Sequence, residues 1–253
     1  MIAHGHAAVV LADPEQLAGL AGHLDDSLDD ADWTRIRRVR VPGQREVVHG
    51  SRLLQRHAIA GAADVLPSAL RFVADADGKP RVAAPSAACA IAFSASNTRG
   101  LVGCAVVRGA EVGFDVEAVP AEVDDDLLRE CLAPSELAEL IALPQARRAA
   151  AFTLLWACKE AYLKAIGVGL GTAPAAVATV AAREGRRLRD PRAAARWTLH
   201  RIAVGERHAA VACVPQGFAV ETSWFAAPAV DGARVAPAAA MPHAASGAPG
   251  VGP

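Results

Sequence analysis

The sequence predicts an α+β protein with two similar lobes, each a small, mainly antiparallel sheet packed with helices, related by a pseudo-twofold axis. Two observations lead to this prediction. A helix followed by a hairpin occurs twice, in residues 45–107 and 147–214. The chain has 253 residues, 53% of them hydrophobic, which is enough for two lobes around a real core. A cleft between such lobes is the natural ligand site.

The first half is expected to begin with a strand at residues 1–12, which lack the basic start of a signal peptide. Apolar residues at helical spacing predict a helix at 45–61. Residues 89–94 and 101–107 are typical of hairpin strands, with the polar stretch 96–100 as their loop.

The second half continues the alternation of strands and helices. A strand is expected at 112–116, a helix starting at Pro134 and a longer helix at 147–166. The final strands are predicted at 197–204, 208–214 and 219–225.

We therefore place an N-terminal lobe at residues 1–112 and a C-terminal lobe at 113–225. Residues 226–253 are mostly Ala, Pro and Gly, and such a segment buries too little surface to offset its ordering entropy. We expect it to be a disordered tail.

Composition and charge exclude several classes of protein. The net charge of −1 argues against a nucleic-acid binder that relies on bulk positive charge. The five cysteines form no C-x-x-C pair, so they indicate neither zinc nor a disulfide framework and fit a reducing cytoplasm. No apolar run is long enough to cross a bilayer.

Lysine is rare in this chain. The 26 basic residues comprise 23 arginines and only three lysines, Lys79, Lys159 and Lys164. If Arg has replaced Lys wherever either cation serves, the remaining lysines mark positions that need a compact ammonium. The alternative is that three residues fell at random positions.

The segment Gly113-Phe114-Asp115-Val116-Glu117 places two carboxylates on one face of the predicted strand. Neighbouring carboxylates repel unless a cation lies between them, and a small set of hard oxygen ligands suits Mg²⁺. The alternative is an ordinary strand with a solvated acidic face.

The helix at 147–166 carries charges within its apolar stripe. Lys159 and Glu160 fill one turn of that stripe, so they should be paired or bound to an ion. Glu160 and Lys164 are four residues apart and share one side of the helix. The alternative is a simple surface pair.

Two further segments could contact a phosphate. In Asp77-Gly78-Lys79-Pro80, a glycine turn can present an ammonium as a point charge. The stretch 96–100, Ser-Asn-Thr-Arg-Gly, offers hydroxyl, amide and guanidinium donors. Ordinary turn chemistry is the alternative for both segments.

Taken in order, these four segments resemble the motifs of the 4′-phosphopantetheinyl transferase superfamily, and the resemblance extends over roughly residues 30–225. Two lobes in one chain are similar to its larger class. The resemblance implies a Mg²⁺-dependent enzyme that transfers the 4′-phosphopantetheine arm of coenzyme A to a serine of an apo acyl or peptidyl carrier protein. It also implies release of 3′,5′-ADP. Because each chain holds both lobes, we expect a monomer, and the cysteines, net charge and apolar runs described above predict a cytoplasmic protein without nucleic-acid or membrane partners.

The resemblance also implies roles for individual residues. Asp115, Glu117 and Glu160 would bind Mg²⁺, Glu160 would take the proton of the carrier serine, and Lys164 would act in catalysis with it. The implied coenzyme-binding residues are Lys79, Pro80, Ser96, Asn97, Lys159, Lys164, Arg45, Arg52 and Arg56.

One position departs from the family pattern. The family loop usually reads Ser-His-Ser or Ser-His-Thr, whereas this chain has Asn97 in the place of histidine. Asparagine can donate a hydrogen bond, but it carries neither positive charge nor a transferable proton. A non-catalytic relative that binds coenzyme A or a carrier protein is therefore one alternative, and another Mg²⁺-nucleotide enzyme is a second.

Overall fold

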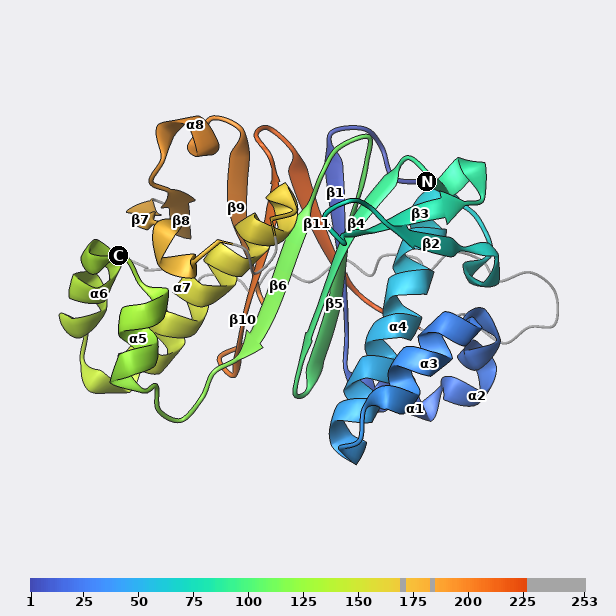
Figure 1. Ribbon diagram of the computed structural model, residues 1–253, viewed down its shortest axis with the longest axis horizontal. Coiled ribbons are helices and arrows are strands. Elements are labelled where there is room, and N and C mark those ends of the chain that lie inside the picture. The colour runs from blue at the N-terminus through green and yellow to red at the C-terminus, as the bar shows by residue number, and fades with distance from the viewer. Residues whose placement is uncertain (169–171, 183–184, 227–253) are drawn as a thin grey trace, which may run out of the picture.

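A computed structural model describes residues 1–168, 172–182 and 185–226 of the chain. It confirms the α+β class: small sheets, most of whose strand pairs are antiparallel, are packed with helices (Figure 1). The helices are α1 (Pro14–Gly19), α2 (Ala21–Leu24), α3 (Asp30–Arg38), α4 (Pro42–Ala63), α5 (Asp125–Cys131), α6 (Pro134–Ile141), α7 (Gln145–Ile166) and α8 (Pro191–Ala194). The strands are β1 (His6–Ala12), β2 (Arg71–Ala74), β3 (Pro80–Ala84), β4 (Ile91–Thr98), β5 (Leu101–Arg108), β6 (Gly113–Ala118), β7 (Thr179–Ala182), β8 (Gly185–Leu188), β9 (Trp197–Ile202), β10 (His208–Pro215) and β11 (Ala219–Trp224).

Two sheets form the centre of the molecule. The first has the order β11-β1-β5-β4 and the second β6-β10-β9, while β2-β3 and β7-β8 are separate hairpins. Strand β11, expected in the C-terminal lobe, pairs in parallel with β1 and so extends the first sheet. The lobe boundary at residue 112 stays a prediction, and the predicted tail lies outside the described residues except for Ala226.

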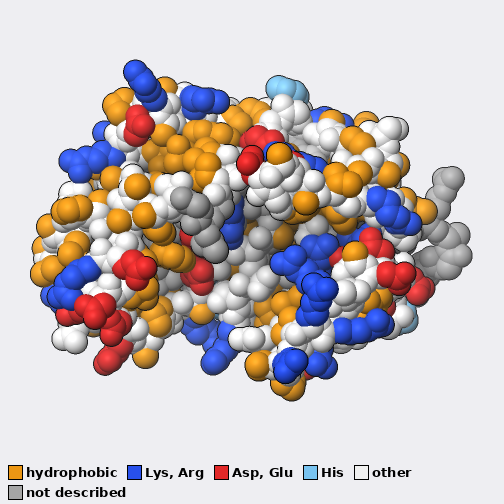
Figure 2. All heavy atoms as spheres, viewed as in Figure 1, with side chains coloured by type: hydrophobic (Ala, Val, Ile, Leu, Met, Phe, Trp, Pro, Cys, Tyr) orange, Lys and Arg blue, Asp and Glu red, His pale blue; other side chains and the backbone are white. Residues whose placement is uncertain are grey.

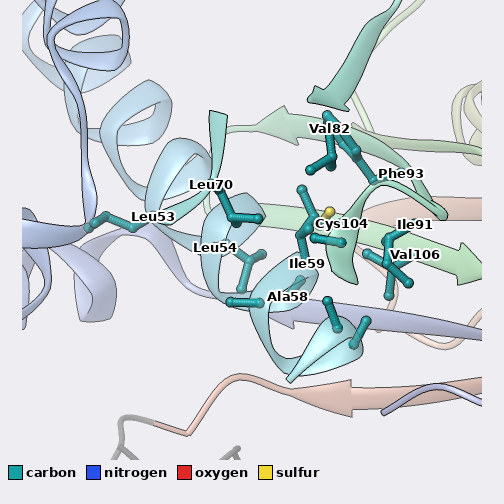
Figure 3. Packing of buried hydrophobic residues seen from close by; sticks show 14 of the residues in the cluster. Leu53, Leu54, Ala58, Ile59, Leu70, Val82, Ile91, Phe93, Cys104 and Val106 are labelled. Carbon is teal, nitrogen blue, oxygen red and sulfur yellow. The ribbon is translucent and has the colours of Figure 1, made fainter. Parts of the chain in front are cut away.

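The long helix α4 packs on the first sheet. Leu54 and Ile59 of α4 belong to one buried cluster with Phe93 of β4 and with Cys104 and Val106 of β5 (Figure 3). Figure 1 shows α4 beside the first sheet and α7 beside the second, with β4, β5 and β6 running between them. Each half therefore repeats a long helix on antiparallel strands.

Helix α7 packs on the second sheet through small residues. Ala157 and Ala161 are fully buried, together with Val211 of β10. At the start of β6, a Cβ atom added to Gly113 would lie 1.8 Å from the carbonyl oxygen of Ala161. Only glycine fits at this approach, so β6 is held directly against α7. The helix ends at Gly167, whose φ of 76° suits a glycine cap.

Side-chain hydroxyls join the two sheets along β4 and β6. The polar stretch 96–100 was expected to be a loop, but the structure continues β4 through Thr98 and leaves a turn of two residues. The hydroxyl of Ser94 accepts a hydrogen bond from the Phe114 amide at 2.9 Å, and that of Thr98 accepts one from the Ala118 amide at 3.2 Å. Because these side chains satisfy the backbone at the edge of β6, polar residues are favourable in this strand.

Replacing Gly113 with alanine should destabilise the protein, because the new methyl group would meet the backbone of α7. We expect a loss of about 1–3 kcal/mol or more in the free energy of unfolding, measured by urea denaturation. The control is Gly61→Ala in α4, where an added Cβ has no neighbour within 4 Å. That control should stabilise the protein by up to about 1 kcal/mol. Equal stability of the two variants would contradict the close approach.

Candidate active site

A cavity of about 410 Å³ lies between α4, β4, the turn before β3 and the end of α7. Figure 2 shows that this face of the molecule is hollowed in the middle, with Lys and Arg side chains gathered beside the hollow. The cavity is lined in part by the predicted site residues Arg52, Lys79, Pro80, Asn97 and Lys164. Residues far apart in the sequence therefore meet around one space.

Asp115 is buried beside this cavity and is only half satisfied. Its Oδ1 atom accepts hydrogen bonds from Lys164 Nζ at 2.6 Å and from Ser96 Oγ at 2.9 Å. Its Oδ2 atom is also buried and has no hydrogen-bond partner within the described residues. Leaving a buried carboxylate oxygen unpaired is unfavourable, so this oxygen suits a cation or a hydrogen-bond donor as its partner.

The carboxyl groups of Glu117 and Glu160 lie close enough to Asp115 for its charge to shift their pKa values. Burial raises the pKa of Glu117 above its usual value, and the charges of Asp115 and Glu160 raise it further. Burial also raises the pKa of Glu160, and the negative charge of Asp115 adds to the effect, while Lys164 opposes it. The indole nitrogen of Trp156 donates a hydrogen bond to Glu117 at 3.2 Å. Three acids from β6 and α7 thus interact through their charges.

These acids fit a Mg²⁺ ion that retains an open shell. In the part of the chain that the structure describes, no three His, Cys, Asp or Glu side chains lie together as a group that could hold a metal ion by themselves. Mg²⁺ usually takes only one or two carboxylates and completes its shell with water and phosphate oxygens. The unpaired Oδ2 of Asp115 and the mutual repulsion of the three carboxylates match that requirement.

The structure places Lys159 away from the cavity, in contrast to the coenzyme contact predicted for it. Lys159 is fully buried and forms an ion pair with Glu136 of α6 at 2.6 Å. Lys159 and Lys164 are five residues apart in α7, so their side chains point about 140° apart around the helix axis. Lys159 therefore points away from the cavity, whereas Lys164 lines it.

Arg56 likewise is not among the described residues that line the cavity. Its guanidinium is fully buried, forms ion pairs with Asp29 and Asp32, and donates to the carbonyl oxygens of Pro67 and Leu70. These acceptors leave no route to a coenzyme phosphate. The sequence showed only an arginine on a broad basic face, since its acidic partners lie 24 and 27 residues away.

The other two predicted arginines differ in their positions. Arg52 lines the cavity and pairs with Asp32 at 2.5 Å. Arg45 is exposed, donates to the carbonyl oxygen of Val39 at 2.9 Å, and is not among the described residues that line the cavity. A coenzyme contact by either residue stays a prediction.

Lys79 holds the G-K-P turn to the opposite half of the molecule. Its ammonium donates to Glu111 at 2.7 Å and to the carbonyl oxygen of Lys164 at 2.8 Å, with the Ala165 carbonyl oxygen at 3.3 Å. The last carbonyls of a helix lack intrahelical partners, so Lys79 caps the end of α7. Lys79 and Pro80 line the cavity, and contact with a phosphate stays a prediction.

The serine and asparagine of β4 occupy different positions. Ser96 holds both Asp115 and Lys164, at 2.9 and 3.1 Å. Asn97 lines the cavity, and its amide donates a long hydrogen bond of 3.4 Å to Ser51. Ser51 could not be predicted as part of the cavity, because a single serine within a helix carries no distinguishing pattern.

Arg52, Lys79 and Lys164 line one cavity, and cations of this kind suit a ligand that carries phosphate groups. Residues 111–213 match the 4′-phosphopantetheinyl transferase superfamily. The chain is 30% identical over 164 residues to the 4′-phosphopantetheinyl transferase HetI of Nostoc sp., covering 64% of this chain and 68% of that protein. The chain belongs to the 4′-phosphopantetheinyl transferase superfamily.

Other relatives agree with this assignment. The putative 4′-phosphopantetheinyl transferase slr0495 of Synechocystis sp. is 29% identical, with coverage of 56% of this chain and 58% of that protein. The L-aminoadipate-semialdehyde dehydrogenase-phosphopantetheinyl transferase of Eremothecium gossypii is 33% identical, with 59% and 58% covered. The chain thus spans less than two thirds of these two relatives. The crystal structure of Thermotoga maritima holo-(acyl-carrier-protein) synthase aligns at 25% identity and a TM-score of 0.34, over 42% of this chain and 62% of that one.

The raised pKa of Glu160 predicts a pH-dependent stability of the metal-free protein. When the pKa of a carboxyl group is higher in the folded state than in the unfolded state, the folded protein loses stability as the pH rises above the unfolded-state pKa. For a glutamate this ordinary pKa is 4.5. In EDTA, Glu160→Gln should therefore gain free energy of unfolding relative to the wild type between pH 4.5 and 7.5. Urea denaturation at both pH values measures the difference. The exposed control Glu206→Gln should show a smaller change, and an equal change in both variants would contradict the prediction.

Proposed function

We propose that this chain transfers the 4′-phosphopantetheine group of coenzyme A to a serine of an apo acyl or peptidyl carrier protein and releases 3′,5′-ADP. The observation that carries the proposal is the buried, unpaired Oδ2 of Asp115, which is one of the three interacting acids. The other oxygen of Asp115 pairs with Lys164, and Lys164 lines the cavity. Membership of the superfamily supports the same reaction.

Asp115, Glu117 and Glu160 would hold Mg²⁺, which when bound neutralises charge on the pyrophosphate of coenzyme A. Lys164 would donate to a pyrophosphate oxygen as a compact cation, since its ammonium is partly exposed beside Asp115. Arg52 and Asn97 line the same cavity and would bind other polar groups of the coenzyme.

The transfer step needs a group that removes a proton from the carrier serine. The raised pKa of Glu160 makes its carboxylate a stronger base than an ordinary glutamate. The serine oxygen forms a bond to the phosphorus that bears pantetheine, and the bond from this phosphorus to the bridging oxygen breaks. The bridging oxygen leaves with the electron pair as part of 3′,5′-ADP, and the serine proton passes to Glu160.

Both walls of the cavity come from one chain, which supports a monomer as the working unit. A reducing cytoplasm is consistent with the five free cysteines, of which Cys89 alone is exposed. Over residues 1–168, 172–182 and 185–226, no helix combines the length and apolarity needed to cross a membrane.

Glu160→Gln should lower turnover by at least about a hundredfold, because the amide cannot accept the serine proton, while coenzyme A binding partly survives. Intact-protein mass spectrometry of an apo carrier protein with coenzyme A and Mg²⁺ measures the transfer, with EDTA as the metal control. Wild-type turnover in this variant would contradict the role of Glu160. Coenzyme A binding by the wild type without transfer to any carrier would instead indicate a binding-only relative, for which Asn97 would be the first position to test.

Asp115→Asn should weaken the effect of Mg²⁺ on stability. With coenzyme A present, Mg²⁺ should raise the melting temperature of the wild type, because a ligand that binds only the folded state stabilises it. Differential scanning fluorimetry with and without Mg²⁺ should show a smaller shift in the variant, and the exposed Glu206→Gln should keep the wild-type shift. An undiminished shift in Asp115→Asn would show that this carboxylate does not bind the metal.

A further inference from the structure

We propose that Lys159 is a positioning residue: its buried ion pair with Glu136 fixes the turn of α7 that holds Glu160 near Asp115. This inference deepens the proposed function and rests on it where turnover is the readout. It assigns to Lys159 a role different from the coenzyme contact that the sequence motif implies.

The surroundings of the Lys159 ammonium are complete without a ligand. Its three N–H donors face Glu136 Oε2 at 2.6 Å and the carbonyl oxygens of Pro174 at 3.0 Å and Val177 at 2.7 Å. An ammonium has three donors and no acceptor, so these oxygens satisfy it. Both charged side chains of the pair are 0% exposed.

Glu136 is equally well satisfied and connects three elements. Its Oε2 accepts from the Ala133 amide at 2.9 Å, at the start of α6. Its Oε1 accepts from the amide and the hydroxyl of Thr179 in β7, at 2.8 and 2.7 Å. The ion pair therefore joins α6, β7 and the middle of α7 at a single point.

Such a pair is better suited to fixing geometry than to adding stability. Replacing a buried ion pair by apolar residues is often neutral or stabilising, whereas removing one partner is strongly destabilising. Here the pair fixes the rotation of α7 about its axis, because the ammonium and the carboxylate must meet with their hydrogen bonds aligned.

The orientation of the Glu160 side chain depends on this rotation of α7. Within the described residues its side chain makes no hydrogen bond or ion pair, so the backbone of α7 determines where it points. Because Lys159 and Glu160 are adjacent in one helix, a rotation of α7 that loosens Lys159 also turns Glu160 away from Asp115. By holding Lys159 in place, the ion pair with Glu136 therefore also fixes the position of Glu160.

The test compares Lys159→Met, Lys164→Met and the double variant Glu136→Leu/Lys159→Met. In Lys159→Met the affinity for coenzyme A, measured by isothermal titration calorimetry, should equal that of the wild type. In Lys164→Met it should weaken by about tenfold, because a charge-assisted hydrogen bond is lost. A tenfold loss in Lys159→Met would show that this lysine contacts the coenzyme and would overturn the proposal.

The double variant separates positioning from stability. Lys159→Met should lower the melting temperature by roughly 10 °C, because it leaves Glu136 buried and unpaired. The double variant should recover the melting temperature, yet its kcat should stay about tenfold below the wild type because Glu160 is no longer held in place. If kcat returned together with the melting temperature, the pair would be only structural and the proposal would fail.

A readout that needs no turnover keeps the two proposals distinct. If the wild type modified no carrier protein, the proposed function would fail on its own. Hydrogen exchange of the amides of residues 156–164 would still decide the role of the pair. These amides should exchange at least about tenfold faster in the thermally recovered double variant than in the wild type. Unchanged exchange would overturn the positioning role.

Discussion

The contact between β6 and α7 at Gly113 is the constraint on which the site depends. An added Cβ atom would lie 1.8 Å from a backbone oxygen of the helix, so the strand and the helix touch without an intervening side chain. Strand alternation then turns Phe114 and Val116 into the apolar core and leaves Asp115 and Glu117 on the side of the acidic cluster. Carboxylates from a strand and a glutamate and a lysine from a helix thereby come together.

Charge in this site is balanced only in part. Lys164 neutralises one oxygen of Asp115, while the other oxygen stays unpaired and the pKa values of Glu117 and Glu160 are raised. Burying such a cluster lowers the stability of the folded protein, and a bound cation would restore that stability. The hydroxyls of β4 support this arrangement, since Ser96 holds Asp115 and Lys164 together.

Patterns within one element could be predicted from the sequence, and partnerships between elements could not. Helix α7 and strand β6 lie close to their predicted positions, because each has a clear apolar period. The burial of Arg56 and Lys159 depends on acids in other elements, so it could not be predicted from the sequence around either residue. The short hairpins β2–β3 and β7–β8 could not be predicted, since strands of four or five residues show little apolar periodicity. The stretch 96–98 reads as a loop until the backbone edge of β6 is placed beside it.

The scarcity of lysine has a chemical consequence for the surface. The side chains of Lys79, Lys159 and Lys164 are 11%, 0% and 31% exposed, and each ammonium is bound to oxygen acceptors. Arginine supplies the remaining positive charge, and its guanidinium stays protonated and is a poor nucleophile. Activated acyl thioesters modify free amines, so the folded chain offers them few side-chain targets.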